Sequence, residues 1–320
     1  MNTLYREPYS QERLQEAYVK KVETYALAYI SEHYDHPDDP HMRLDYHTSA
    51  HTSDVMYRTE VLLRILSPQD VLEGRLLAAG HDLYQEWTDA IKMVGAYPAV
   101  TKKRAIGLNE KVSADMLVAH MRDINGKQGL VFPETIIDRV HAGIAITVPS
   151  FDQQLGTVLQ PNFKSDVHIA AQALALADLG GGAMHGGAYF VEEGNRNFRE
   201  MNSDITEYAR LYGFELSKQC ASRGEYEALR ERFLADAAAQ VRFAQGRLTV
   251  LPHELSMLPP EHRYAVSQSM GKLPEAIQSA RAVLDMRSVM TLDELVADVY
   301  KSSPHMNSFK ESEKTFRIVC

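Results

Sequence analysis

Apolar residues recur at intervals of three and four along most of this 320-residue chain, which is the period of an amphipathic helix. In residues 10–34 the apolar positions are Leu14, Ala17, Tyr18, Val22, Tyr25, Ala26 and Ile30. The same period predicts helices over residues 50–66, 69–83, 109–122, 134–146, 166–179, 191–212, 224–244, 274–286 and 291–301. Alternation of the strand kind is nearly absent, and residues 129–133 and 247–252 are too short to build a sheet. We therefore expect an all-α protein.

Charge and cysteine content exclude several classes of protein. The chain has 34 Lys and Arg residues against 43 Asp and Glu residues, a formal charge of −9, which argues against binding a nucleic-acid polymer. The two cysteines, Cys220 and Cys320, are too few for a disulfide framework or a Cys-rich zinc site. No apolar signal peptide and no run of about 18 apolar residues is present, so we expect a cytoplasmic protein without a membrane span. Whether it forms a homo-oligomer is left open.

Proline-rich connections suggest three parts of the chain. Residues 33–47 are rich in Pro and Asp, and three prolines interrupt the helical pattern within residues 252–262. We expect an N-terminal helix and connection over 1–43, a central domain over 44–252, and a helical C-terminal appendage over 253–320. The long connection of residues 86–108 has the length of a lid beside a site.

Two aspartates occur where a buried charge is costly. His81 and Asp82 end the apolar stretch of residues 71–80, and Asp178 lies in the most apolar helical stretch of the chain. A carboxylate in such surroundings needs an ion pair or a metal ion. Together with nearby histidines, these aspartates predict a site of nitrogen and oxygen ligands, which suits Mn, Fe, Co, Mg or Zn.

The order of these residues resembles a known signature. His51, then His81-Asp82, then Asp178 is similar to the H…HD…D pattern of the HD superfamily of metal-dependent phosphohydrolases. Residues 46–55 (YHTSAHTSDV) resemble the YHNxxHxxDV stretch of cyclic-nucleotide phosphodiesterases, and residues 109–114 (NEKVSA) match the NExxSA element of small bacterial HD proteins. The resemblance covers about residues 44–250 and implies an HD-domain helical bundle with additional N- and C-terminal helices.

The resemblance also implies roles for particular residues. The metal ligands are expected at His51, His81, Asp82 and Asp178. His47 matches the histidine that protonates the leaving oxygen, and its i, i+4 spacing from His51 predicts that both lie on one helix face. Glu110 is expected near the metal-bound water, as an orienting group or a proton acceptor, although capping of a helix by Asn109 and Glu110 is an alternative.

The sequence departs from the family pattern at three places. Thr48 replaces the asparagine of the phosphodiesterase stretch, and Asn109 and residues 147–150 stand where two-metal members carry extra histidines. These differences favour a single metal ion and count against the di-iron oxygenase branch. His141 lies in the corresponding region but is displaced by about two helical turns.

Basic residues that could hold a substrate phosphate are Arg58, Lys102, Lys103, Arg104, Arg196 and Arg199. The glycines of residues 180–182 lack the strand and the lysine of a phosphate-binding loop, so we interpret them as a flexible turn with His185 in an exposed loop.

The function that these residues favour is metal-dependent hydrolysis of a phosphate ester in a small phosphorylated molecule, a nucleotide or a cyclic nucleotide. The alternatives are a regulatory or interaction protein that keeps a metal-bound HD fold, and an iron-dependent HD oxygenase.

Overall fold

The computed structural model describes residues 8–36, 43–86, 92–94, 97–99 and 105–301. Helices make up most of this part of the chain, which confirms the expected all-α fold. No helix in the described ranges is long and apolar enough to cross a membrane.

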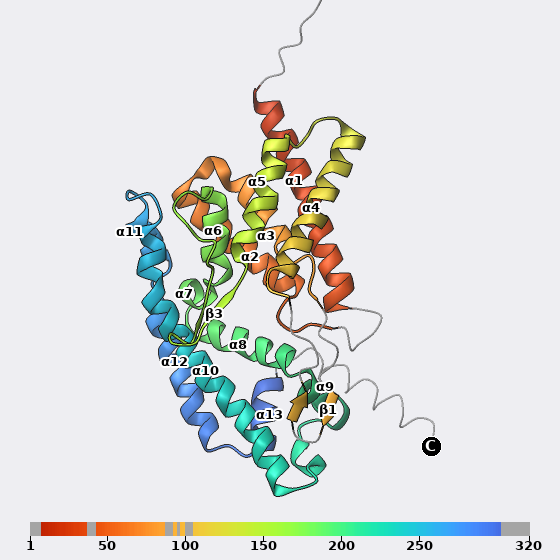
Figure 1. Ribbon diagram of the computed structural model, residues 1–320, viewed down its shortest axis with the longest axis vertical. Coiled ribbons are helices and arrows are strands. Elements are labelled where there is room, and N and C mark those ends of the chain that lie inside the picture. Colours follow the sequence, from red (N-terminus) through yellow and green to blue (C-terminus); the bar gives the residue numbers. More distant parts are fainter. Residues whose placement is uncertain (1–7, 37–42, 87–91, 95–96, 100–104, 302–320) are drawn as a thin grey trace, which may run out of the picture.

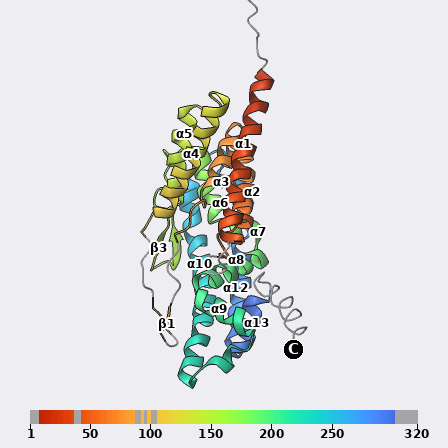
Figure 2. The ribbon, with the colours of Figure 1, turned by 90° about the vertical axis from the view of Figure 1, so that its right-hand side faces the viewer.

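The helices that precede the glycine-rich segment lie together in the upper part of the molecule (Figures 1 and 2). They are α1 (Pro8–Ile30), α2 (Ser49–Leu66), α3 (Val71–Gly80), α4 (Leu108–Gln128), α5 (Glu134–Ile144) and α6 (Ile169–Asp178). Helix α2 packs against both α3 and α6, while α1 covers α3 and α4 pairs with α5. Their apolar faces form one hydrophobic core, to which Leu62, Leu77 and Leu174 contribute fully buried side chains.

The remaining helices follow the glycine-rich segment after α6. They are α7 (Gly181–His185), α8 (Gly187–Met201), α9 (Ser203–Tyr212), α10 (Arg223–Ser256), α11 (Arg263–Ser269), α12 (Leu273–Ser288) and α13 (Leu292–Tyr300). Helices α10 and α12 lie side by side, and α8 packs against α12 (Figure 1). Short helical turns occur at η1 (Ser31–Asp35), η3 (Pro68–Asp70), η4 (Ala145–Thr147) and η5 (Leu216–Gln219).

The terminal segments share the core of the central helices. Helix α10 continues through Pro252 to Ser256, past the start of the expected C-terminal appendage. Helix α11 packs against α2, and Val266 and Leu273 belong to the same hydrophobic cluster as Val22 of α1 and Leu62 of α2. The segments on both sides of residues 44–252 therefore help to hold the helices of the central part in place.

Two small antiparallel hairpins were not expected from the sequence. One pairs β1 (Lys92–Val94) with β2 (Tyr97–Ala99), and the other pairs β3 (Ser150–Asp152) with β4 (Thr157–Leu159). The second hairpin packs closely on α10, because a Cβ atom at Gly246 would lie 2.6 Å from the carbonyl oxygen of Leu155. Residues 247–252, in contrast, are part of α10 rather than a strand.

Candidate metal centre

The four expected metal ligands come from the ends of three helices that pack together. His51 lies in the first turn of α2, whereas His81 and Asp82 follow α3 directly and Asp178 is the last residue of α6. The carboxyl end of a helix carries a partial negative charge, so the ends of α3 and α6 both favour a cation near these residues.

Ligand atoms of His51, His81 and Asp178 lie within 4.8 Å of one another, and Asp82 lies close to both histidines. Nε2 of His51 lies 3.5 Å from Oδ2 of Asp82 and 3.9 Å from Oδ1 of Asp178. Nε2 of His81 lies 3.1 Å and 3.8 Å from the same two oxygens. Ligands about 2.1 Å from one ion lie about 3 Å apart at a right angle and about 4.2 Å apart when opposite. All four distances fall between these limits.

A glutamine side-chain amide donates a hydrogen bond to one oxygen of each carboxylate. Gln85 donates from Nε2 to Oδ1 of Asp82 at 3.0 Å, and Gln160 donates from Nε2 to Oδ2 of Asp178 at 3.1 Å. The other oxygen of each carboxylate is the one that faces the two histidines. Hydrogen bonds of this kind orient metal ligands in proteins.

The two histidine rings are also oriented by their surroundings. Nδ1 of His81 lies 2.7 Å from the carbonyl oxygen of Ala78, so it carries a proton and donates it there. Nε2 of His81 is therefore the ring atom that faces the carboxylates. The ring of His51 lies against the ring of Tyr46, with 4.5 Å between the ring centroids.

Burial and charge perturb all four groups. Burial lowers the pKa of His51 well below its usual value, which keeps this ring neutral as a ligand requires. Burial also opposes a charge on His81, but Asp82 and Asp178 outweigh it and raise the pKa of His81 to about 9. Burial raises the pKa of Asp178, whereas His81 holds the pKa of Asp82 well below its usual value despite burial.

Two atoms of the cluster are buried without a hydrogen-bond partner. These are Nε2 of His81 and Oδ2 of Asp82, a nitrogen and an oxygen that both face the centre of the cluster. A buried polar atom without a partner is destabilising unless something satisfies it. A divalent cation would satisfy both atoms at once, so the residues present fit a metal ion.

A second group of possible ligands is already neutralised. Among the described residues, Asp70, Glu73 and His168 also bring ligand atoms together. Arg139 binds both carboxylate oxygens of Glu73, at 3.0 and 2.7 Å. A cation there would have to displace a bidentate guanidinium, so we consider only the His51 cluster as a metal centre.

His47 lies beside the metal cluster and is held by a residue that the sequence did not reveal. Its Nδ1 lies 2.5 Å from Oε1 of Glu200, at the end of α8. The other oxygen of Glu200 accepts hydrogen bonds from the backbone amides of Tyr46 and His47, at 2.8 and 3.0 Å. Burial opposes the charge of Glu200, but His47 and these amides lower its pKa below the usual value.

The helical spacing predicted for His47 is wrong. Helix α2 begins at Ser49, because the hydroxyl of Thr48 accepts a hydrogen bond from the amide of His51 and caps the helix. His47 therefore precedes the helix. It still lies near the first ligand, with 6.0 Å between the ring centroids of His47 and His51, because Glu200 holds the turn.

The element of residues 109–114 binds the segment that follows Asp82. The side-chain oxygen Oδ1 of Asn109 accepts from the backbone amide of Glu86 at 2.9 Å, and the Ser113 hydroxyl accepts from the backbone amide of Tyr84 at 2.9 Å. The alternative in which Asn109 caps a helix is wrong, since α4 begins after Gly107 without a side-chain cap.

Glu110 lies in the first turn of α4 and is coupled electrostatically to the residues of the metal cluster. Burial raises the pKa of its carboxyl group, and the negative charges of Asp82 and Asp178 act in the same direction. This electrostatic coupling is consistent with the expected position near a metal-bound water.

Arg58 is an internal residue rather than a surface phosphate ligand. Its side chain is fully buried, with Nε donating to the carbonyl oxygen of Ala177 at 2.8 Å and Nη1 to the Tyr189 hydroxyl at 2.9 Å. Tyr189 donates onward to Asp54 at 2.7 Å, and the Glu193 carboxylate lies 3.6 Å from Nη1. Arg58 thus ties α2 to α8 and to the residue before Asp178.

The other predicted phosphate ligands are only partly described. Arg199 is buried and binds Asp45, the Val299 carbonyl and Glu192, so it too has a structural role. Arg196 is partly exposed and pairs with Glu192 at 3.4 Å. The remaining candidates lie outside the described residues: Lys102, Lys103 and Arg104.

Two further histidines do not reach the cluster as ligands. His141 is half exposed and lies 2.9 Å from Asp115 of α4. His185 ends α7, where its ring packs against Tyr189 and Nε2 is buried without a hydrogen-bond partner. The expectation of an exposed loop histidine at this position is therefore wrong.

The glycines after Asp178 form a tight helix contact instead of a flexible turn. Helix α7 begins at Gly181, where a Cβ atom would lie 2.0 Å from Oε2 of Glu193. At Gly182 it would lie 2.6 Å from the ring of Phe190. Only glycine allows α7 to approach α8 this closely, and this contact fixes the chain just after the last ligand.

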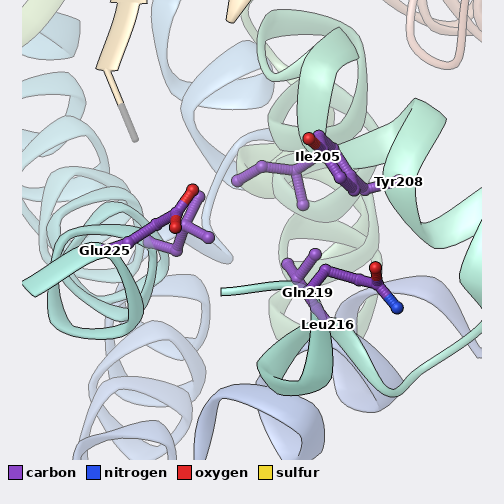
Figure 3. Close-up of a pocket in the computed structure, with 6 residues that line it drawn as sticks. Ile205, Tyr208, Leu216, Gln219 and Glu225 are labelled. Carbon is purple, nitrogen blue, oxygen red and sulfur yellow. The ribbon is translucent and has the colours of Figure 1, made fainter. Parts of the chain in front are cut away.

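A hollow elsewhere in the molecule is too small for a substrate. Figure 3 shows it between α9, η5 and the start of α10, with a volume of about 10 Å³, enough for one water molecule. It is lined by Ile205, Tyr208, Leu216, Gln219, Glu225 and Leu229.

Comparisons of the chain with protein-family models, with curated proteins and with solved structures find no match.

Proposed function

We propose that this chain is a metal-dependent hydrolase of phosphate esters that acts on a nucleotide or a cyclic nucleotide. The observation that carries the proposal is the cluster of ligand atoms from His51, His81 and Asp178, which lie within 4.8 Å of one another beside the His47–Glu200 pair. Oδ2 of Asp82 lies 3.5 and 3.1 Å from Nε2 of His51 and His81. The resemblance of the same residues to the HD signature supports it.

The four ligands would hold Mn, Fe, Co, Mg or Zn, all of which accept nitrogen and oxygen donors. Such an ion supplies a Lewis acid for the phosphoryl group and lowers the pKa of a bound water from 15.7 to roughly 7. Glu110 would be the residue that orients such a water or accepts its proton.

His47 is the proton donor in this proposal. Nδ1 of His47 donates to Glu200, which leaves Nε2 as the atom that gives a proton to the departing oxygen of the ester. The buried negative charge of Glu200 stabilises the protonated ring. Arg58 is enclosed, so in this proposal the metal ion and His47 would bind the phosphate.

A screen of the purified chain tests the proposed function. The five metal ions are supplied one at a time. With at least one of them, the chain is expected to hydrolyse a cyclic nucleotide, a nucleotide or a phosphomonoester, and a chelator should abolish this turnover. Absence of hydrolysis with every metal, or turnover that survives Asp82→Asn, would contradict the proposal. Oxygen consumption by an iron-loaded sample would point to an oxygenase instead.

Glu200→Gln is expected to lower kcat about 100-fold for an ester with an alcohol leaving group, because the charge that stabilises protonated His47 is lost. A nitrophenyl phosphate ester, whose leaving group needs no proton, should be hydrolysed at nearly the unaltered rate. Steady-state kinetics with the two substrates measures the difference.

Glu60→Gln is the matched control, since Glu60 pairs with Arg64 on the outer surface of α2. It should leave both rates unchanged. Equal losses on both substrates in Glu200→Gln would assign Glu200 a purely structural role and rule out proton donation through His47.

A further inference from the structure

The π-turn η1 contacts both segments that carry the metal ligands on α2 and α3. It closes with a hydrogen bond from the amide of His36 to the carbonyl oxygen of Ser31, at 2.8 Å. Turns of this type inside helical segments are often found at functional sites. It lies in residues 1–43, outside the part of the chain that resembles HD proteins.

Tyr34, within this turn, is bound to the segment after Asp82. Its side chain is buried, with 5% of the residue exposed. The hydroxyl donates to the carbonyl oxygen of Leu83 at 3.2 Å and accepts from the amide of Gln85 at 2.9 Å. Because residues 83–86 follow the end of α3 and are not helical, these two bonds help to fix their backbone.

Gln85 transmits this constraint to the ligand. Its side chain is buried and its Nε2 donates to Oδ1 of Asp82, while its Oε1 accepts from Nδ2 of Asn109 at 2.8 Å. The amide therefore cannot turn over without breaking both bonds. It selects Oδ2 as the oxygen of Asp82 that faces the histidines.

The neighbouring residue of the turn reaches the other ligand segment. The carboxylate of Asp35 accepts hydrogen bonds from both the amide and the hydroxyl of Ser49, at the start of α2. Ser49 lies two residues before His51. One five-residue turn thus holds the start of α2 and the end of α3 at a fixed separation.

We propose that Tyr34 is a positioning residue of the metal centre, which sets the affinity for the metal ion through Gln85 and the orientation of Asp82. Asp35, in the same turn, fixes the start of α2 through Ser49 and thereby the position of His51. The inference rests on the proposed metal site, and it adds that the N-terminal segment tunes that site without touching the ion.

Metal affinity of the full chain tests the inference without a substrate. Titration with Co²⁺, followed by its visible absorption, should show about tenfold weaker binding in Tyr34→Phe and about 10–100-fold weaker binding in Gln85→Met. The double variant should bind Co²⁺ more weakly than Gln85→Met does, but the further loss of affinity should be less than tenfold. The two losses overlap because Tyr34 and Gln85 act on the same ligand.

Tyr300→Phe is the matched control. Tyr300 is fully buried in a separate hydrophobic cluster with Ile205 and Phe233, and its hydroxyl lies 2.8 Å from Oγ1 of Thr206. This variant should lose thermal stability as Tyr34→Phe does, but should bind Co²⁺ within about twofold of the unaltered chain.

The outcomes separate this inference from the proposed function. Unaltered Co²⁺ affinity in both Tyr34→Phe and Gln85→Met would overturn the inference while leaving the metal site in place. Gln85→Met keeps the tyrosine, so it decides the result if Tyr34→Phe fails to fold. An unaltered chain that binds no Co²⁺ would overturn the inference and the metal site together, whereas binding without hydrolysis contradicts only the proposed activity.

Discussion

Asp82→Asn and Asp178→Asn are each expected to weaken metal binding by more than about 100-fold, beyond the loss typical for groups that only support a ligand. The reason lies in the glutamine that binds each carboxylate. Gln85 and Gln160 donate N–H groups, so an asparagine must keep its oxygen on the glutamine side. Its NH₂ group would then face the metal position, where a donor cannot coordinate a cation.

Thermal unfolding with and without Mn²⁺ measures this loss. At a metal concentration of 100 Kd the unaltered chain should gain about 2.7 kcal/mol, and the two variants should gain almost nothing. Asp236→Asn is the matched control, because Asp236 is also a largely buried carboxylate that accepts from a glutamine, Gln240, at 2.7 Å. If Mn²⁺ stabilised all three variants equally, Asp82 and Asp178 would not be metal ligands.

Arg58→Met is expected to destabilise the fold by about 3–5 kcal/mol, because it leaves buried partners without a cation. The carbonyl of Ala177, the Tyr189 hydroxyl and the Glu193 carboxylate would all lose their donor. Burial already raises the pKa of Glu193 to about 7. Arg58 lowers this pKa, so its removal raises the pKa of Glu193 further. The unaltered chain gains stability from the Arg58–Glu193 pair at pH 8, where its Glu193 is charged, and little at pH 6, so the loss should be larger at pH 8.

Urea unfolding at the two pH values tests this expectation. Arg64→Met is a suitable control on the same helix, since Arg64 is exposed and pairs with Glu60 on the surface. It should change stability by less than about 1 kcal/mol. Glu193→Gln in the Arg58→Met background should recover part of the loss at pH 8. A loss as small as that of Arg64→Met would show that the buried pair contributes little.

The helices could be predicted from the sequence because they follow a period that depends on local pattern alone. The ranges expected for residues 50–66, 134–146 and 291–301 lie within two residues of α2, α5 and α13. The extension of α10 to Ser256 could not be predicted, because a proline normally interrupts such a pattern. Both hairpins have strands of only three residues, too short to leave a recognisable alternation.

The ligand cluster could be proposed because a carboxylate in an apolar helix is anomalous wherever it occurs. The residues that orient it could not. Glu200 lies 153 positions from His47, and Tyr34 lies 51 positions from Gln85, so neither pair leaves a local pattern. Polar residues that act through tertiary contacts look like ordinary surface residues in a sequence. The same limitation explains Arg58, which had the character of a phosphate ligand but is enclosed by α8.

The most direct test of the metal centre is an anomalous difference map from a crystal of the full chain grown with Mn²⁺. We expect one strong peak about 2.0–2.2 Å from Nε2 of His51 and His81, Oδ2 of Asp82 and Oδ1 of Asp178. Absence of a peak at this position, or a peak at Asp70, Glu73 and His168 instead, would contradict the assignment.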